Sequence, residues 1–532
     1  MIRAPVCIIG CGPIGLTGAL LLSRFGIKTL LLERRGALNT HPRSRFVDTN
    51  TMELLRELGV EKEVEATGLG PDWTECNRWC KDLSGEEYAR IPSPTFHTIP
   101  RSTSPCLPVM TAQDHVEAAL IGKVRKDPNI DLRFHTEARD LEQSASETRL
   151  SIHNLQSGEV DEVVADYTIG ADGPSTSTRA VIGSVLEAEP MAINAQDVIF
   201  DADLSQYVGD RRGALLYNTP RMMAGVIFQP LDGVRRWRCQ VTVPEPKLLA
   251  EDEIIARICE ALGTTDDVPI TITSMSLWQP TPGCTSSFQK GRIFLAGDAA
   301  HISVPTGGLG NNTGFSGIRN LAWKLAFVLR GISSPAILET YEEEHRPVAL
   351  ERIALGVQLT QAMVPMMFNY VAGEDISEDI EATRPYGNYD GLLLGFEMKS
   401  DLIASEQSAP PSVKDPIKDF VPAIRAGRRA PHIWLDEEQS LSLLDSFGHG
   451  FRLVLGADAD AERWRECVDE LSAGGFPISI EQLPDLPQDC VYASDGAVLV
   501  RPDGIIADHW RSAEVATAQS RKRLTRHLPI QD

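Results

Sequence analysis

Residues 4–33 read APVCIIGCGPIGLTGALLLSRFGIKTLLLE, and the order of features in this stretch predicts the fold. The apolar residues 6–9 predict a short buried strand, followed by a helix that ends at Gly26. A second apolar run leads to Glu33 and predicts another strand. The turn between the first strand and the helix has the pattern G-x-G-x-x-G, formed by Gly10, Gly12 and Gly15. Strand, glycine turn, helix and strand in this order are typical of the βαβ unit of an α/β fold.

The chemistry of this unit suits a dinucleotide. Glycines let the backbone approach a pyrophosphate, and the start of the helix offers free N–H groups and the positive end of its dipole. Glu33 lies about twenty residues beyond the glycines, where an acid can accept two hydrogen bonds from a ribose diol. The neighbouring Pro13 and Arg34 are counted among the cofactor-binding residues as well. The pattern alone suits FAD and NAD equally.

The length and charge of the chain limit the classes of protein to which it can belong. A chain of 532 residues is too long for one core, so two or three domains are expected. Its 51 basic and 74 acidic side chains argue against a nucleic-acid partner, because basic surfaces supply most of that affinity. The apolar stretch from Ile353 contains glutamines and Pro365, so it predicts a buried helix and no membrane span.

The ten cysteines are scattered and predict no metal site. Cys76 and Cys80 lie four positions apart, but no second pair of cysteines or histidines completes a zinc site. Free thiols suit a reducing compartment. The first residues lack a basic leader and a cleavage site, so a cytoplasmic protein is expected.

A second glycine-rich stretch, LAGDAAHISVPTGGLGNN, spans residues 295–312. An apolar run ends at Asp298, and three glycines follow at 307, 308 and 310. His301 is expected to be a packing residue. A helix is predicted next, because apolar residues recur at helical spacing at Phe315, Ile318, Leu321, Leu325 and Val328. The start of this helix would offer free N–H groups to negative charge on a ligand.

Three further segments contain candidate ligand-binding residues. Arg43 lies in HPRSRF before a predicted helix, and Gln113 lies in VMTAQDHVEAAL at the start of another. The stretch ADYTIGADGPSTSTR predicts a strand that leads to Asp172. The sequence contains no second G-x-G-x-x-G, which argues against reductases with two dinucleotide-binding domains.

With these motifs in this order, the chain resembles the class A FAD-dependent aromatic hydroxylases, the single-component flavoprotein monooxygenases. The closest pattern is the branch of phenol hydroxylase and 2,4-dichlorophenol 6-monooxygenase. The resemblance implies a Rossmann-like FAD-binding domain of the p-hydroxybenzoate hydroxylase type, an antiparallel β-sheet domain for the substrate, and a C-terminal thioredoxin-like domain. The expected boundaries are 1–70, 101–189 and 285–400 for the first domain, 71–100 and 190–284 for the second, and 420–532 for the third.

The resemblance also implies roles for single residues. Asp172 belongs to an Asp-Gly motif that is associated with both FAD and the nicotinamide cofactor, and Pro305 matches the proline beside the isoalloxazine ring. The residues that match contacts to the adenosine diphosphate half, the phosphates or the ribityl chain of FAD are Gly10, Gly12, Gly15, Glu33, Arg43, Gln113 and Asp298. The loop facing the flavin pyrimidine edge contributes Gly308, Gly310, Asn311 and Asn312.

Four positions depart from the family pattern. Leu309 replaces a residue that is usually polar, and Asn311 replaces an apolar one. Gly317 stands where Asp is usual. His345 replaces a common Arg and is expected at the surface.

The middle of the chain contains short strand-like runs that fit a sheet over the active site. In RRWRCQV, Arg236 and Arg238 alternate with apolar residues and therefore share one face of a strand. This pair could attract a phenolate beside the flavin, or the face could simply be solvated, which is commoner for charged residues. Arg45 and Asp48 could reach the pocket or could be surface loop residues. The candidates for catalysis are therefore Pro305, Arg45, Asp48, Arg236 and Arg238.

A new unit is expected after the proline-containing link SAPPSVKDPIKDFVPAI. The segment VLVRPDGIIADHW predicts two strands around a Pro-Asp-Gly turn. Cys467 and Cys490 are far apart and form no C-x-x-C, which argues against a dithiol redox role. A structural role is favoured, and a homodimer is possible.

The resemblance implies an FAD-dependent monooxygenase. NAD(P)H would reduce FAD, O2 would form a C4a-hydroperoxide, and one oxygen atom would enter a phenolic or polyketide-like aromatic substrate. Two alternatives stay open. The same flavin chemistry could give Baeyer–Villiger oxidation, epoxidation or oxidative dearomatisation, or the chain could be a non-catalytic FAD-binding partner or sensor.

Overall fold

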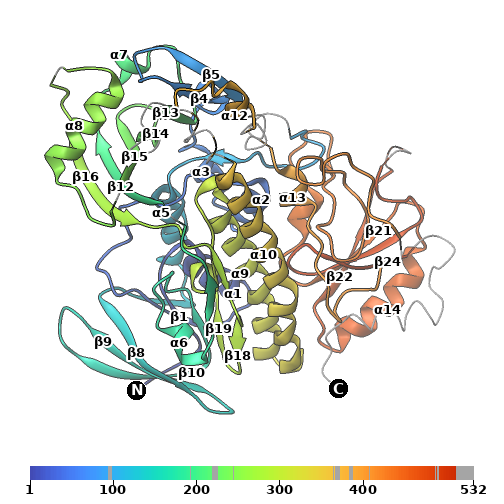
Figure 1. Ribbon diagram of the computed structural model, residues 1–532. Helices are drawn as coiled ribbons and strands as arrows, with labels where there is room; N and C mark the ends of the chain where they lie inside the picture. Colours follow the sequence, from blue (N-terminus) through green and yellow to red (C-terminus); the bar gives the residue numbers. More distant parts are fainter. Residues whose placement is uncertain are drawn as a thin grey trace.

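The computed structural model describes residues 1–510 except 94–98, 192, 219–225, 244, 266, 363–364, 366–368, 370–371, 383–387, 407, 486 and 488–489. The described residues build three large sheets and two small ones, and the long helices α9 (Leu309–Leu329) and α10 (Thr340–Gln361) lie between the large sheets (Figure 1). The prediction of an α/β fold is confirmed by the first of these sheets.

The first sheet contains the predicted βαβ unit. Its strands in spatial order are β18 (Gln289–Lys290), β19 (Ile293–Leu295), β10 (Val160–Gly170), β1 (Ile2–Ile9), β2 (Thr29–Leu32) and β7 (Ile130–Arg133). All neighbours from β19 to β7 are parallel, and the hairpin of β8 (Thr136–Gln143) and β9 (Thr148–Asn154) extends β10. Because parallel strands end at one edge of a sheet, the loops after β1, β2, β10 and β19 meet there.

Helices cover the faces of this sheet. They include α1 (Pro13–Arg24), α2 (Thr49–Glu57), α3 (Glu61–Glu65), α5 (Gln113–Val124) and α6 (Thr178–Ile182). A Cβ at Gly18 in α1 would lie 2.9 Å from Ile318 Cγ1 in α9, so the missing side chain lets these two helices touch. The short strands β3 (Phe46–Val47) and β6 (Val109–Met110) pair beside α2.

The second sheet is formed by two separate parts of the chain. Its strands in spatial order are β16 (Thr271–Trp278), β12 (Asn194–Asp201), β15 (Arg236–Val243), β14 (Val226–Pro230), β13 (Leu215–Asn218), β4 (Cys76–Cys80) and β5 (Glu87–Pro92). Neighbours are antiparallel except β13 and β4, which are parallel, so the sheet is mixed at this edge. One face packs Trp237 and Cys239 into a buried cluster with helix α8 (Glu251–Leu262).

The third sheet belongs to the C-terminal unit. Its order is β22 (Ile478–Gln482), β21 (Phe451–Leu455), β23 (Ala497–Val500) and β24 (Ile506–Trp510), with α14 (Ala461–Ala473) between β21 and β22. The predicted hairpin around the Pro-Asp-Gly turn is confirmed by β23 and β24. Phe451 packs against Trp323 of α9, with 5.7 Å between ring centroids, so this unit rests directly on α9.

The remaining elements are short. Strands β11 (Leu186–Ala188), β17 (Gly283–Thr285) and β20 (His301–Ile302) form a small sheet, and the short helices are α4 (Pro71–Thr74), α7 (Ser205–Val208), α12 (Ser377–Ala382) and α13 (Asp390–Leu394). The apolar stretch from Ile353 is helical and partly buried as far as α10 extends, and most of its remainder lies outside the described residues. Within the described part of the chain, no helix is both long and apolar enough to span a membrane.

Candidate cofactor and substrate site

The glycine turn after β1 leaves open space at one position only. A Cβ at Gly10, where φ is +109°, would lie 2.3 Å from Ala171 O, and a Cβ at Gly15 would lie 1.9 Å from Gly10 O. A Cβ at Gly12 would meet no atom within 4 Å. Gly12 also precedes α1 without a side-chain cap, so the first N–H groups of the helix stay free. This arrangement fits the pyrophosphate of a dinucleotide.

Glu33 is fixed at the end of β2. Its Oε2 accepts a hydrogen bond from Cys11 N–H at 3.1 Å, and its Oε1 accepts one from Arg35 N–H at 3.0 Å. Each carboxylate oxygen keeps a second lone pair that can accept a ribose hydroxyl. Gln113 donates from Nε2 to Glu117 Oε1 at 2.7 Å, and burial raises the pKa of Glu117 to about 7. The sequence interpretation missed Glu117, although its spacing from Gln113 places both on one helix face.

Two aspartates lie at the same edge of the sheet. Burial raises the pKa of Asp298, and the nearby Arg43 and Arg179 oppose this shift. Arg179 donates from Nη2 to Asp298 O at 3.2 Å and thereby fixes the turn. Asp172 Oδ2 accepts Thr178 Oγ1–H at 3.1 Å, whereas Asp172 Oδ1 is buried and has no partner among the described residues. Such an unsatisfied acceptor fits the hydroxyl of a bound ligand.

The glycine-rich loop before α9 has a backbone conformation that favours glycine. Gly307 and Gly308 have φ values of +86° and +64°, and a Cβ at Gly308 would lie 2.8 Å from Phe46 Cβ. Helix α9 begins at Leu309 without a side-chain cap, so its first N–H groups are available to a ligand. Pro305, at the start of the loop, is exposed.

Asn312 holds this loop through its side chain. Its Nδ2 donates to Phe46 O at 3.0 Å and to Gly308 O at 2.8 Å, and its Oδ1 accepts Asp48 N–H at 3.0 Å. The side chain is therefore occupied by protein groups, and we expect its backbone to face the cofactor. Gly310 lies against Ser303, while the side chains of Asn311 and the exposed Arg34 make no hydrogen bond to another described residue.

Arg45 and Asp48 are both buried, so the surface-loop interpretation is wrong for each. Asp48 is the N-cap of α2, because its Oδ1 accepts Thr51 N–H at 2.7 Å. Burial raises the pKa of Asp48, and Arg352 opposes the shift. Arg45 donates to Pro230 O at 3.0 Å and to Ala214 O at 2.8 Å. Arg45 thus joins the segment before α2 to the second sheet, and Asp48 caps α2.

Arg236 and Arg238 lie on the face of the second sheet that is turned to the first unit, so the solvated-face interpretation is wrong for Arg238. Arg238 is 4% exposed and binds both oxygens of Asp197, at 3.1 and 2.6 Å. Burial opposes ionisation of Asp197, but Arg238 and His41 together outweigh it and lower the pKa to about 2. Arg236 lies 2.7 Å from Asp114 Oδ2. Both charges are thus already paired, which removes the argument that they attract a phenolate.

Tyr389, the N-cap of α13, contacts the loop, and Asp390 is the first residue of that helix. Tyr389 Oη donates to Gly307 O at 2.8 Å. Asp390 is largely buried, and burial together with Asp48 raises its pKa to about 7. The sequence interpretation missed both residues, because nothing local indicates a contact with a loop 82 positions earlier.

Two of the departures from the family pattern meet in the core. His345 is fully buried, so the expectation of a surface position is wrong. A Cβ at Gly317 would lie 2.4 Å from His345 Nε2, which shows that the glycine makes room for the imidazole. His301 is buried as expected, with its ring centroid 5.8 Å from that of His345.

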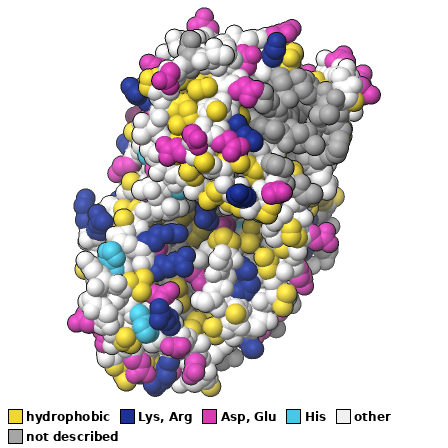
Figure 2. All heavy atoms as spheres, turned by 60° about the vertical axis from the view of Figure 1, so that its left-hand side comes forward, with side chains coloured by type: hydrophobic (Ala, Val, Ile, Leu, Met, Phe, Trp, Pro, Cys, Tyr) yellow, Lys and Arg dark blue, Asp and Glu magenta, His cyan; other side chains and the backbone are white. Residues whose placement is uncertain are grey.

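One face of the molecule is hollowed, and Figure 2 shows Lys and Arg side chains around this hollow. Arg238 Nη1 donates to Arg43 O at 3.2 Å, so the polar face of the second sheet lies against the segment that precedes α2. Within the described residues, no group of three or more His, Cys, Asp or Glu could hold a metal ion, and the ten cysteines are free thiols.

The comparisons with known proteins agree with this geometry. A family model described as an FAD binding domain matches residues 3–354, and one described as the C-terminal part of aromatic-ring hydroxylases matches residues 424–529. The chain therefore belongs to the FAD-binding aromatic-ring hydroxylase family. It is an FAD-dependent monooxygenase with the fold of the p-hydroxybenzoate hydroxylase type.

Relatives with known names cover nearly the whole chain. Aklavinone 12-hydroxylase RdmE of Streptomyces purpurascens is 32% identical over 96% of this chain and 96% of its own. The 2,4-dichlorophenol 6-monooxygenase of Delftia acidovorans is 28% identical over 96% and 95%. The solved structure of the monooxygenase PieE with FAD and substrate has a TM-score of 0.87 at 27% identity, covering 99% of this chain and 100% of that chain.

Proposed function

We propose that the enzyme uses NAD(P)H and O2 to hydroxylate a phenolic or polyketide-like aromatic compound. One observation carries this proposal: the open glycine turn, the Asp298 turn and the uncapped start of α9 converge at one sheet edge, facing a polar sheet from a second unit. The relatives named above act on a polyketide and on a chlorinated phenol, which supports an aromatic substrate.

Bound FAD would supply the redox chemistry, taking a hydride from NAD(P)H and activating O2. The chain supplies binding and charge stabilisation. Gly12 admits the pyrophosphate, Glu33 accepts the ribose hydroxyls, and the first N–H groups of α9 stabilise negative charge on the ring edge. The pKa of Asp390, about 7, allows its carboxyl group to exchange a proton at neutral pH.

We also propose a division of labour among the units. The first sheet and its helices bind FAD, with boundaries near 1–70, 101–189 and 285–400, and the second sheet covers the substrate, with boundaries near 71–100 and 190–284. The C-terminal unit, from about residue 420, is thioredoxin-like. One parallel strand pair extended by two antiparallel strands supports this assignment.

The test measures NADPH and NADH oxidation by the purified holoenzyme, with and without phenols and polyketide aromatics, while hydrogen peroxide is followed. Stimulated oxidation with little peroxide and a product heavier by one oxygen atom supports the proposal. Stimulation with stoichiometric peroxide means that the compound binds but is not the substrate. Absence of stimulation across both compound classes would count against an aromatic substrate.

A second outcome of the same chemistry has its own support. Tetracenomycin A2 monooxygenase-dioxygenase of Streptomyces glaucescens is 29% identical over 99% of this chain. Relatives of this similarity therefore catalyse more than simple hydroxylation. Product structure from mass spectrometry and NMR would separate hydroxylation from ring insertion, epoxidation or dearomatisation.

A further inference from the structure

A fully buried ion cluster joins the C-terminal unit to α10 and α9. Arg501 donates from Nη1 and Nη2 to the two oxygens of Glu344, at 2.7 and 2.8 Å. Lys324 Nζ donates to Glu344 Oε2 at 2.8 Å, and all three side chains are inaccessible to solvent. Burial opposes ionisation of Glu344, but Arg501 and Lys324 outweigh it and lower its pKa. The cluster is therefore ionised at neutral pH.

The same cluster holds the middle of α9. Arg501 also binds Asp503, with 3.1 Å between Nε and Oδ1. Asp503 Oδ2 accepts Trp323 Nε1–H at 3.1 Å and Asn320 Nδ2–H at 3.3 Å. The turn between β23 and β24 thus fixes two residues of α9 directly. Breaking a buried network of this kind costs far more than breaking an exposed pair.

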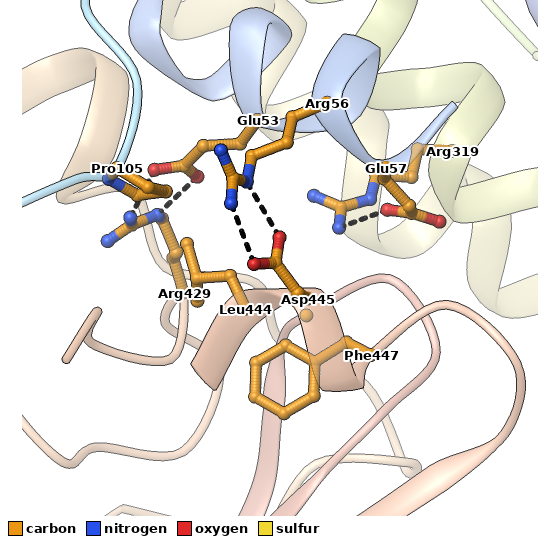
Figure 3. Close-up of a pocket in the computed structure, with 10 residues that line it drawn as sticks. Glu53, Arg56, Glu57, Pro105, Arg319, Arg429, Leu444, Asp445 and Phe447 are labelled. Atoms are coloured by element: carbon orange, nitrogen blue, oxygen red, sulfur yellow. Dashed lines mark hydrogen bonds and ion pairs between the residues drawn. The ribbon is translucent and has the colours of Figure 1, made fainter. Parts of the chain in front are cut away.

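A second set of contacts along this interface ties α2 to the same unit. Figure 3 shows three ion pairs that line a small pocket, namely Glu53–Arg429, Arg56–Asp445 and Glu57–Arg319. Three carboxylates face three guanidinium groups, so the pocket has no excess charge that would recruit an ionic ligand. Glu53–Arg429 and Arg56–Asp445 join α2 to the C-terminal unit, and Glu57–Arg319 joins α2 to α9.

Both helices lead from this interface to the cofactor site. Helix α2 begins beside Asp48 and α9 begins at Leu309, and Asn312 joins the two starts. Asn320 lies about 16 Å from the start of α9 at 1.5 Å per residue. A tilt of about 5° there would displace the start by about 1.4 Å, and errors of ~1 Å in an active site can cost on the order of 10²-fold in rate.

We propose that Arg501 is a positioning residue for the flavin site, which acts through Glu344 and Asp503 to hold α9 in line with the cofactor. The C-terminal unit then contributes to FAD binding although none of its described residues lies in the glycine turn, the Asp298 turn or the loop before α9. This inference depends on the FAD site and not on the identity of the substrate, so its failure can be told apart from a failure of the proposed function.

The test compares full-length Arg501→Lys and Asp503→Asn with the control Asp445→Asn. The control breaks an ion pair across the same interface whose side chains are 23% and 24% exposed. Circular dichroism and thermal unfolding establish that each variant is folded. FAD affinity is then measured by fluorescence titration of the apoprotein, together with the visible spectrum of bound FAD and the fraction of NADPH that ends as peroxide.

The expected result is at least tenfold weaker FAD binding in Arg501→Lys, with a shifted flavin spectrum and more peroxide in the FAD-saturated protein. Asp503→Asn should change the same quantities in the same direction, and Asp445→Asn should stay within twofold of the wild type. Folded Arg501 and Asp503 variants with wild-type FAD affinity and spectrum would overturn the proposal, whatever their melting temperatures. Equal losses in the control would overturn it too.

Discussion

The glycines of the first turn differ in what an added methyl group would meet. At Gly10 and Gly15 a Cβ would collide with backbone oxygen, whereas at Gly12 it would enter open space. The first two positions therefore serve packing of the chain itself. At Gly12 a side chain would meet no protein atom within 4 Å, so it would compete only with a bound ligand.

Replacing Gly12 by Ala should therefore leave the apoprotein stable within about 0.5 kcal/mol, since surface-like changes that create no clash have small effects. It should weaken FAD binding at least tenfold, because the methyl group would occupy the space of the pyrophosphate. Urea unfolding of the apoprotein and fluorescence titration with FAD measure the two quantities. Gly15→Ala is the matched control and should destabilise the apoprotein. Tight FAD binding by Gly12→Ala would place the cofactor elsewhere.

The pairing of Arg238 with Asp197 makes a different prediction for each arginine of β15. Arg238→Met leaves the Asp197 carboxylate buried without its charge partner and should cost ~3–5 kcal/mol of unfolding free energy. Arg236→Met breaks a partly exposed pair and should cost about 1 kcal/mol or less. Urea denaturation separates the two. If Arg238→Met were as stable as Arg236→Met and only raised KM, the phenolate interpretation would return.

Because His301 is buried, we expect the protein to lose stability in mild acid. Burial, aided by Arg352, lowers the pKa of His301 to about 4, below an unfolded value near 6.5. The unfolded chain therefore takes up the proton first. The contribution of His301 to the free energy of unfolding is fully present above pH 6.5 and is lost as the pH drops toward 4. The loss from His301 between pH 7.5 and 5 is about 2 kcal/mol.

The control for this prediction is His301→Phe, measured by urea unfolding at the two pH values. Asp390 and Glu117 have raised pKa values and act in the opposite direction, so the comparison with the variant is what isolates the histidine. The variant should lose about 2 kcal/mol less than the wild type. An equal loss in both proteins would show that His301 is not the group responsible.

At the scale of elements, local sequence patterns were sufficient to predict many of the strands and helices. The first βαβ unit, the strand at Arg236 and the hairpin around the Pro-Asp-Gly turn were predicted, because periodicity and turn chemistry are local properties. The partners of single side chains were not. Asp197 and Arg238 meet across two strands, and His345 is buried only because Gly317 on another helix leaves room for it.

Helix α13 carries a contact of this long-range kind. Tyr389→Phe removes the hydrogen bond to Gly307 O in the flavin loop and should cost about 1 kcal/mol of stability. It should also raise the fraction of NADPH that ends as peroxide, because the loop is less firmly held. Tyr341→Phe is the matched control, since Tyr341 Oη donates to Leu295 O at 2.9 Å, in the core. Equal peroxide yields in the two variants would deny Tyr389 a role in the loop.

At the scale of the whole molecule, the sequence indicated three units but not how they are joined. Arg501 and Glu344 lie 157 positions apart, and Arg429 and Glu53 lie 376 apart. No composition or spacing rule relates such residues, since each looks like an ordinary surface charge in its own segment. The folded chain buries these charges at the interface between the units, so the C-terminal unit is continuous with the helices that begin at the cofactor site.

The origin of the transferred oxygen tests the central claim most directly. The FAD-loaded enzyme is supplied with NADPH, an aromatic compound that stimulates NADPH oxidation, and ¹⁸O2 in ordinary water. The monooxygenase assignment predicts a product that carries one ¹⁸O atom and requires FAD for its formation. A product that draws its new oxygen from water, or consumption of all the O2 as hydrogen peroxide with every compound that stimulates oxidation, would contradict it.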